Sequence, residues 1–289
     1  MACSIAAAAF LAACGAFGND NPNAPSAPSS APAPGSTITY TALGASDTAG
    51  YGSSVPCVPF TDCPNGMGYV QVATRQLNAQ GYKATLSNLG IPTTVIGPDF
   101  EALGQQYNRT IIGNLLDREV PFVPPNATVV SVFIGGNDVN TISSALGAGA
   151  GGSDPAGYID QQVKAFGADY AALVKGVRSR AASARLIALN LPNLAGLPYL
   201  AGNSLPQRQA AQRAAVGMTK VVNALTSQGV TVIDLMCDAR TYQSSSVSSD
   251  GFHPSDAGYA FIAAELVKAI TSTSYPAPSA SCAQMTLVP

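Results

Sequence analysis

The sequence contains a single histidine, His253, and it lies three residues after an aspartate in the run Asp-Gly-Phe-His-Pro at residues 250–254. Histidine takes up and returns a proton near neutral pH, which acyl transfer through a serine requires. A carboxylate three residues upstream, here Asp250, can fold back to Nδ1 of the ring, fix its tautomer and leave Nε2 facing a nucleophile. Taken alone, the run is also typical of a surface histidine beside an Asp-Gly turn. The spacing predicts a general base only if the chain supplies a nucleophile elsewhere.

Three further segments offer partners for His253, each directly after a predicted strand. Ser46 lies among small residues, where its hydroxyl can be exposed as a nucleophile or can cap a helix. Asn137 follows two glycines, which let the backbone turn and approach a ligand closely, so its amide can point at a developing oxyanion. The alternative for this segment is a glycine-rich β-turn. Gly90 can present a backbone N–H in the same direction, although alone it is only a turn glycine.

The elements that would position these residues follow from the hydrophobic pattern. Short β-branched runs alternate with segments whose apolar residues recur every three or four positions. This alternation predicts an α/β fold, a three-layer α/β/α sandwich with a central parallel sheet of about five strands, flavodoxin-like in arrangement. Ligands of such sheets bind beyond the carboxyl ends of the strands, so the candidate residues should meet at one edge. The predicted strands are residues 37–43, 82–87, 129–134, 185–190 and 230–235, and the predicted helices are 68–80, 108–119, 155–180, 206–227 and 256–270.

Together these segments resemble the SGNH family, also called GDSL-like esterases and lipases, from about residue 37 to residue 270. Gly-Ala-Ser-Asp at residues 44–47 is similar to the family's nucleophile block, with Ala in place of the usual Asp. Gly-Gly-Asn-Asp at 135–138 matches the third block, and the run at 250–254 matches the fifth. The glycine of the second block maps to Gly90.

The resemblance implies a serine hydrolase that cleaves carboxylic esters. Ser46 would be the nucleophile, His253 the base and Asp250 the group that orients it, while the N–H groups of Ser46 and Gly90 and the side chain of Asn137 would form the oxyanion hole. No cofactor or metal is implied. The ester could be a small molecule, a lipid or an acylated sugar. Two alternatives stay open, a surface acyltransferase and a binding module without catalysis on the same fold.

Two loops are predicted to wall the site, residues 51–66 and residues 141–154. The second contains Gly-Ala-Gly-Ala-Gly-Gly at 147–152, which fits the dinucleotide-binding pattern GxGxxG in form. Because this run lies well beyond the nearest predicted strand, we interpret it as a loop beside the site.

The N-terminus predicts export. Residues 4–13 are apolar but too few to span a bilayer, and Leu-Ala-Ala-Cys at 11–14 resembles a lipobox, so residues 1–14 are interpreted as a signal peptide with Cys14 lipidated. A plain secretory signal, giving a soluble protein, is the alternative. Residues 15–36 are rich in Pro, Ala and Ser and are predicted as a linker from the cell envelope to one domain over residues 37–289.

Cysteine and charge counts support this interpretation. Cys57, Cys63, Cys237 and Cys282 form an even set, which in an exported chain favours two disulfides, most simply Cys57 to Cys63 and Cys237 to Cys282. A zinc site is the poorer alternative, because the chain has one histidine and these cysteines form no CxxC pair. A net charge of −2 with scattered basic residues argues against nucleic-acid partners. We expect a monomer.

Overall fold

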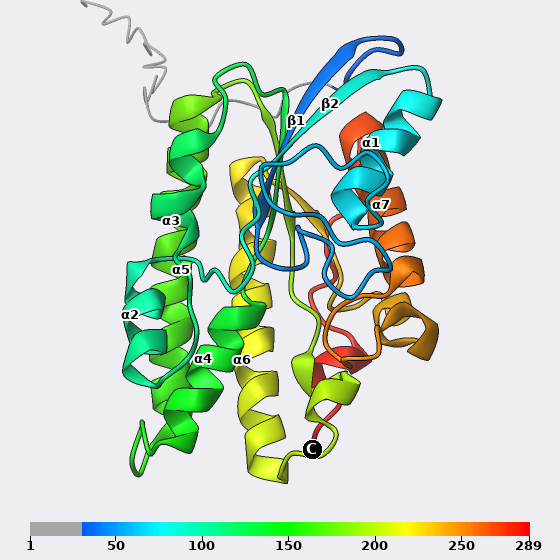
Figure 1. Ribbon diagram of the computed structural model, residues 1–289. Coiled ribbons are helices and arrows are strands. Elements are labelled where there is room, and N and C mark those ends of the chain that lie inside the picture. Colours follow the sequence, from blue (N-terminus) through cyan, green and yellow to red (C-terminus); the bar gives the residue numbers. More distant parts are fainter. Residues whose placement is uncertain (1–30) are drawn as a thin grey trace, which may run out of the picture.

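The computed structural model describes residues 31–289, which form a five-stranded parallel sheet between two layers of helices (Figure 1). The strand order is β2-β1-β3-β4-β5, so the predicted three-layer α/β/α fold is confirmed. The expected signal peptide, Cys14 and the linker up to residue 30 lie outside the described residues. The strands are β1 (Thr37–Gly44), β2 (Lys83–Asn88), β3 (Val129–Phe133), β4 (Arg185–Leu189) and β5 (Thr231–Ile233).

Helices cover both faces of the sheet. On one face lie α1 (Tyr69–Ala79) and α7 (Asp256–Thr271), which pack against each other (Figure 1). On the other face lie α2 (Pro98–Gln106), α3 (Leu115–Arg118), α4 (Gly136–Gly147), α5 (Pro155–Arg180) and α6 (Leu205–Ala224) (Figure 1). None of the helices in the described part of the chain is both long enough and apolar enough to cross a membrane. Short 3₁₀ turns are Val120–Phe122, Leu194–Gly196, Pro198–Leu200, Leu225–Gln228, Ala239–Tyr242, Ser244–Ser246 and Ala283–Thr286.

Burial on both faces accounts for the strong strand signal in the sequence. All five residues of β3 and all five of β4 are buried, as expected for central strands covered by helices on each side. The parallel register pairs Gly44 at the end of β1 with Phe133 at the end of β3. Since the two strands end level with each other, the segments carrying Ser46 and Asn137 emerge at the same edge of the sheet.

The predicted helix over residues 108–119 is wrong for its first part. Asn108 has a φ of +56°, which no α-helix accepts, and the chain is non-helical up to Asn114. A single turn, α3, begins there, because the Asn114 side chain accepts a hydrogen bond from the Asp117 N–H at 3.0 Å. The apolar spacing of this segment reflects packing of an irregular loop and one short turn.

The segment after β3 is helical where a loop was predicted. Helix α4 runs to Gly147 and buries Val139, Ile142 and Ala145, which recur every three residues on one face. The sequence pattern did not indicate this helix because two glycines stand at its start, and glycine is a poor helix former that is typical of turns. Gly135, with a φ of +124°, supplies the backbone bend between the strand and the helix. Helix α2, which starts at Pro98, was also not predicted.

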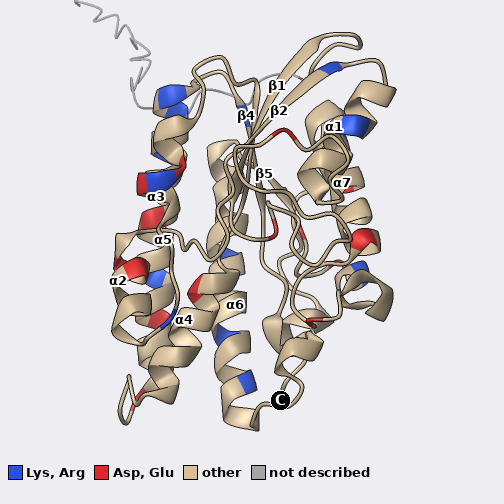
Figure 2. Ribbon diagram, in the orientation of Figure 1, with Lys and Arg blue, Asp and Glu red and all other residues tan. Residues whose placement is uncertain are grey.

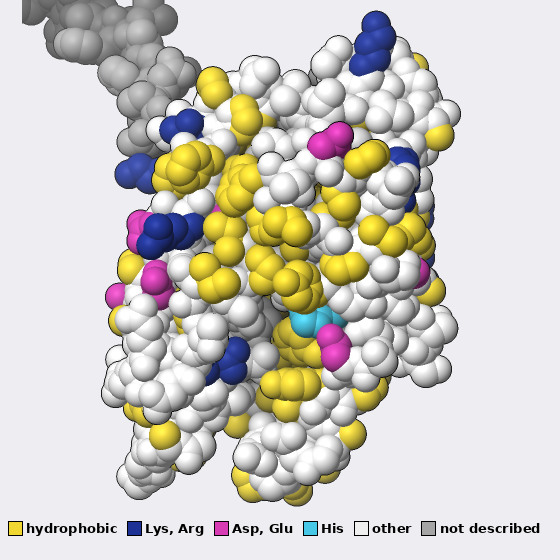
Figure 3. All heavy atoms as spheres, viewed as in Figure 1, with side chains coloured by type: hydrophobic (Ala, Val, Ile, Leu, Met, Phe, Trp, Pro, Cys, Tyr) yellow, Lys and Arg dark blue, Asp and Glu magenta, His cyan; other side chains and the backbone are white. Residues whose placement is uncertain are grey.

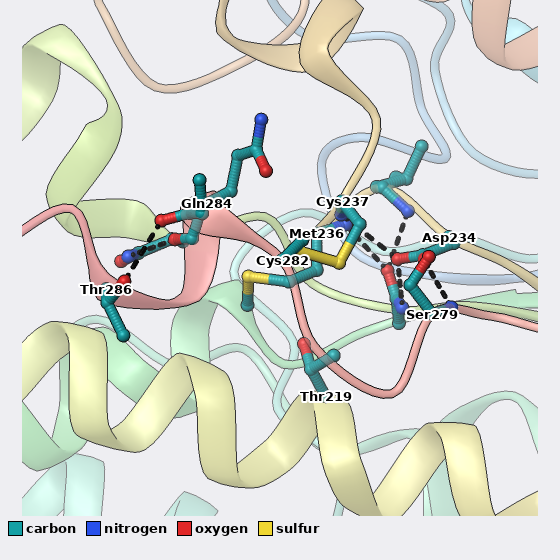
Figure 4. The surroundings of a disulfide bond; sticks show 12 residues. Thr219, Asp234, Met236, Cys237, Ser279, Cys282, Gln284 and Thr286 are labelled. Atoms are coloured by element: carbon teal, nitrogen blue, oxygen red, sulfur yellow. Dashed lines mark hydrogen bonds between the residues drawn. A yellow bond between two sulfur atoms is a disulfide. The ribbon is translucent and has the colours of Figure 1, made fainter.

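Both disulfides expected from the sequence are present, Cys57 with Cys63 and Cys237 with Cys282. The second joins the segment after β5 to the C-terminal region (Figure 4). Beside it, the Asp234 carboxylate accepts the N–H groups of Cys237 at 3.1 Å and Ser279 at 2.8 Å (Figure 4). The disulfide and this carboxylate therefore fasten the C-terminal tail to the end of the sheet.

Candidate active site

Ser46 lies two residues beyond β1, in a tight turn that its own sequence explains. Gly44 adopts a φ of +148°, and a Cβ there would come within 2.3 Å of the Phe133 carbonyl oxygen, so only glycine fits. The turn is closed by the Tyr51 N–H, which donates to the Ser46 carbonyl at 3.0 Å. Ser46 is 7% exposed, and among the hydrogen bonds of residues 31–289 none uses its N–H group. The N–H of Ser46 is therefore unused among the described hydrogen bonds.

His253 faces this serine from the other end of the chain. The Ser46 hydroxyl lies 2.8 Å from Nε2 of His253, and Nδ1 of the same ring lies 2.6 Å from Oδ2 of Asp250. These two contacts place serine, imidazole and carboxylate in one line, the arrangement expected from the sequence.

Asp250 is held as a carboxylate by several donors. Its Oδ1 accepts the N–H groups of Phe252 at 2.8 Å and His253 at 2.9 Å, and the Ser248 hydroxyl at 2.7 Å. Burial opposes its ionisation, but the hydrogen bonds from the His253 ring, from the two N–H groups and from Ser248 outweigh burial and hold the pKa of Asp250 well below its ordinary value. Asp250 is therefore negatively charged at neutral pH and stabilises a proton on the imidazole.

The loop that carries His253 is shaped by backbone contacts. The Ser248 N–H donates to the His253 carbonyl at 2.9 Å, and the Tyr199 N–H donates to the Gly251 carbonyl at 3.0 Å. Gly251 has a φ of +75°, and a Cβ there would meet the Tyr199 nitrogen at 2.8 Å. The Phe252 ring packs edge-on between Tyr199 and the histidine, at centroid distances of 5.1 Å and 4.9 Å. The imidazole is thus fixed by its neighbours before any substrate binds.

Asn137 lies in the first turn of α4 and lines a small hollow of about 30 Å³ together with Ser46. Its Nδ2 donates to the Thr94 carbonyl at 3.0 Å. An amide NH₂ carries two hydrogens, so this bond orients the group while leaving the second hydrogen for another acceptor. Asn137 is brought to the serine as expected.

Gly90 is placed differently from the expectation. Its N–H donates to Oδ1 of Asn88 at 3.1 Å, and a Cβ on Gly90 would lie 2.6 Å from Cβ of Thr48. The N–H that we expected to face an oxyanion is therefore already bonded inside the loop after β2. Nothing in the sequence pattern indicated that Asn88 would fold back onto it.

Glu119 is a buried carboxyl that the sequence did not indicate as part of the site. It accepts the N–H of Gly44 at 2.8 Å and the N–H of Ile91 at 3.3 Å. It therefore ties the strand end that carries Ser46 to the loop after β2. Burial raises the pKa of Glu119 well above its ordinary value, against the effect of these two N–H donors.

Asp47, next to the nucleophile, is a second carboxyl near the histidine. Burial raises the pKa of Asp47, and the nearby His253 acts in the opposite direction. Asp47 lines the small hollow with Ser46 and an adjoining hollow with His253. Two carboxyls, Asp47 and Asp250, therefore lie near the ring of His253, although the position of Asp47 in the nucleophile block did not indicate this.

A cleft of about 1250 Å³ lies between α4, the start of α5, α6 and the C-terminal residues 285–289; we call it the long cleft. Figure 3 shows the histidine among hydrophobic side chains, beside a hollow that continues downward as a groove. The glycine-rich run at 147–152 lines the far part of this cleft, and residues 51–66 approach the site at Gly52, where a Cβ would lie 2.6 Å from Cβ of His253.

Comparison with protein families identifies one match. Residues 42–261 match the model of the GDSL-like Lipase/Acylhydrolase family, which covers the strand ends and the 250–254 loop described above. No curated protein matches the chain at a significant level.

Solved structures with the same fold include three esterases of different origin. A lipase from a goat rumen metagenome has a TM-score of 0.55 at 19% identity, covering 81% of this chain and 98% of its own. An extracellular lipase from Streptomyces rimosus has a TM-score of 0.53 at 18% identity, covering 77% and 94%. An acetyl xylan esterase from Geobacillus stearothermophilus has a TM-score of 0.51 at 16% identity, covering 82% and 96%. At these identities the similarity establishes the shared fold.

Proposed function

The chain belongs to the GDSL-like lipase/acylhydrolase family and is a carboxylic ester hydrolase, and we propose that it works through an acyl-enzyme on Ser46. His253 is the base in this proposal, and Asp250 orients it. The observation that carries the proposal is the 2.8 Å contact between the Ser46 hydroxyl and Nε2 of His253, with Asp250 bonded to the opposite ring nitrogen.

The acylation step transfers a proton through His253 and replaces the carbonyl carbon's bond to the alcohol oxygen by a bond to the Ser46 oxygen. The Ser46 oxygen attacks the ester carbonyl carbon while its proton passes to Nε2 of His253. When the tetrahedral intermediate collapses, the bond between the carbonyl carbon and the alcohol oxygen breaks, and the imidazolium returns its proton to the departing alcohol. Asp250 stabilises the imidazolium without taking the proton.

The oxyanion is stabilised by two donors in this proposal, the Ser46 N–H and the second amide hydrogen of Asn137. Both are unused by the described hydrogen bonds, and the bond from Asn137 to the Thr94 carbonyl orients the amide beforehand. Gly90 is not included, because its N–H is bonded to Asn88.

Hydrolysis of the acyl-enzyme repeats the same chemistry with water. His253 takes a proton from water as the water oxygen attacks the acyl carbon, and then returns that proton to the Ser46 oxygen as the acid leaves. Each of these steps uses only the side chains and N–H groups named above.

Two measurements test the proposal. The protein should hydrolyse at least part of a p-nitrophenyl ester series of increasing acyl length, and a fluorophosphonate probe should label Ser46 in the wild type and not in Ser46→Ala. Full esterase activity in Ser46→Ala would refute the mechanism. Absence of both labelling and hydrolysis in the wild type would favour a binding module on the same fold.

We also propose that the protein is exported and anchored by a lipid on Cys14, with residues 15–36 as the tether and residues 37–289 as the catalytic domain. The two disulfides support an oxidising compartment. Figure 2 shows basic and acidic residues scattered over the described helices. Mass spectrometry of the mature N-terminus tests the anchor, and Cys14→Ala should move the protein from the membrane fraction to the soluble fraction.

A further inference from the structure

We propose that the long cleft binds a negatively charged group of the ester substrate and that Arg109 is the residue that recognises it. The proposal rests on the proposed function, because it assigns a substrate class to the same site. Four features carry it: the state of the Arg109 side chain, the charge of the cleft, the counter-charge nearest to Arg109 and the position of the cleft relative to Ser46.

Arg109 lines the long cleft with a half-buried side chain that has no hydrogen-bond or ion-pair partner among the described residues. Its backbone is held in the loop between α2 and α3, where its N–H donates to the Gly104 carbonyl at 2.9 Å. Its Nε is buried and makes no hydrogen bond with the described residues, and no acidic side chain of that part of the chain forms an ion pair with it. A desolvated guanidinium donor without an acceptor is unusual, since buried polar groups are nearly always bonded. The planar fork of arginine suits a carboxylate or phosphate that would supply two oxygens.

The other charges of the long cleft leave it positive. Three basic residues line it, Arg109, Arg213 and Lys220, against one acidic residue, Asp160. Arg213 and Asp160 satisfy each other through two hydrogen bonds of 2.9 Å and 2.6 Å. Arg109 and Lys220 are therefore the charged side chains of this lining that form no ion pair with the described residues.

Asp138 is the carboxyl that interacts electrostatically with Arg109, and burial makes it a weak counter-charge. Asp138 is fully buried, and its Oδ1 accepts the Ile96 N–H at 3.0 Å. Burial raises the pKa of Asp138 to about 7, so that it is largely neutral below neutral pH. An anion bound in the cleft would meet the positive charge of Arg109 without first displacing an ion pair.

The long cleft begins one helical turn from the candidate oxyanion residue. Asn140 lines the cleft, and Asn137, three residues earlier on α4, lines the small hollow with Ser46. Residues three apart on a helix are surface neighbours, about 5 to 6 Å apart. On the opposite wall, Tyr199 of the cleft contacts the ring of Phe252, which lines the small hollow. One substrate can therefore place its ester at Ser46 and a charged group beside Arg109.

The experiment compares each anionic ester with a neutral ester that has the same scissile bond and the same carbon skeleton around it. One pair puts the charge on the alcohol, 1-butyrylglycerol 3-phosphate against 1-butyrylglycerol. The other pair puts the charge on the acyl group, the mono-p-nitrophenyl ester of glutaric acid against its methyl p-nitrophenyl diester. The quantity measured is the ratio of kcat/KM for the anionic ester to kcat/KM for the neutral ester.

In the wild type, this ratio should exceed one for at least one pair, and the pair that shows it identifies which side of the ester enters the cleft. Arg109→Gln should lower the ratio roughly 10- to 100-fold, since a charge-assisted contact to the substrate is lost. The matched control is the double variant Arg213→Gln with Asp160→Asn, which removes an arginine from the same cleft at unchanged net charge. The ratio of this control should stay within about twofold of the wild-type ratio, because in the wild type the Arg213 guanidinium is already paired with Asp160.

A ratio at or below one for both pairs, or a preference for the anion that Arg109→Gln leaves intact, would overturn this proposal while neutral-ester hydrolysis still supported the mechanism on Ser46. If none of the four esters were hydrolysed, both this proposal and the proposed function would fail. Thermal unfolding of Arg109→Gln separates loss of selectivity from loss of folding.

Discussion

The hydroxyl of Ser46 lies 2.8 Å from Nε2 of His253, although 207 residues separate the two in the sequence. One residue follows the first strand and the other precedes the last helix, so the contact exists only when the whole sheet has assembled. Because the chain has a single histidine, no second imidazole can replace this one. The contact therefore makes the effect of mutating either partner sharply predictable.

Ser46→Ala and His253→Ala should each lower kcat/KM for a p-nitrophenyl ester by roughly 10⁴- to 10⁶-fold. The double variant should lose no more than the worse single variant, because the two residues act as one unit in the same proton transfer. Steady-state kinetics on the three proteins checks this, with unfolding temperatures as the control for folding. Losses that multiply in the double variant would argue against a shared step.

Asn137→Ala should cost less, roughly 10²- to 10³-fold in kcat, with KM nearly unchanged. An oxyanion donor acts on charge that develops in the transition state, so its loss appears in kcat. The Nδ2 bond to the Thr94 carbonyl is lost in the same variant, and thermal unfolding shows whether the loop has loosened. A raised KM with unchanged kcat would mean that Asn137 binds the ground state instead.

The five strands and their shared edge could be predicted from the sequence because short, continuous β-branched runs between helical segments are typical of buried parallel strands. The positions of Ser46 and His253 followed, since each lies next to an element whose type was clear. Helix α5 was predicted with its observed bounds, because Pro155 and a long apolar period mark it plainly. Helix α4 was hidden by glycine at its first turn, where local propensity and tertiary packing disagree.

Contacts made across long separations could not be predicted from the sequence. Glu119 accepts the Gly44 N–H from 75 residues away, and neither residue carries a local sign of the pairing. Gly90 was expected to present its N–H to substrate, but whether an N–H is free depends on a side-chain rotamer, here that of Asn88. Arg109 became a candidate only when the structure showed that its buried Nε has no hydrogen-bond partner among the described residues.

The strongly depressed pKa of Asp250 predicts a specific response to acid. A carboxyl whose pKa is lowered by folding adds stability above the ordinary carboxyl pKa, and this contribution disappears as the pH falls below that value. Unfolding temperature should therefore fall less between pH 5 and pH 3 in Asp250→Asn than in the wild type. Asp62→Asn, an exposed aspartate in the Cys57–Cys63 loop, is the matched control and should follow the wild-type curve.

Asp250→Asn should also lower kcat roughly 10⁴-fold at neutral pH, because an amide favours the wrong imidazole tautomer and cannot stabilise the imidazolium. A variant that kept most of its activity would show that Asp250 does not orient the ring.

The two disulfides should contribute unequally to stability. Cys237 and Cys282 are 45 residues apart and Cys57 and Cys63 only 6, which in the chain-entropy model gives about 4 kcal/mol for the first and about 2 kcal/mol for the second. Replacing each cysteine pair by alanines and measuring the free energy of unfolding in urea tests which disulfide contributes more. The loop closed by Cys237 and Cys282 includes His253. Loss of this disulfide should therefore also lower activity at temperatures where the wild type is stable. A larger effect from the short loop would assign it a native-state role beyond chain entropy.

Asp138 predicts a stability difference that grows with pH. Its carboxyl is fully buried, its Oδ2 has no hydrogen-bond partner among the described residues, and burial raises its pKa to about 7. A carboxyl whose pKa is raised by folding favours the folded state below its unfolded pKa, and that benefit is lost as the pH rises to the folded pKa. Asparagine does not ionise. The free energy of unfolding of Asp138→Asn should therefore rise relative to that of the wild type by about 1.4 kcal/mol per pH unit between about pH 4 and pH 7. Urea unfolding at pH 5, 6, 7 and 8 measures this gain, which should level off above pH 7. A difference between the two proteins that did not change with pH would mean that Asp138 is ionised in the folded protein throughout this range.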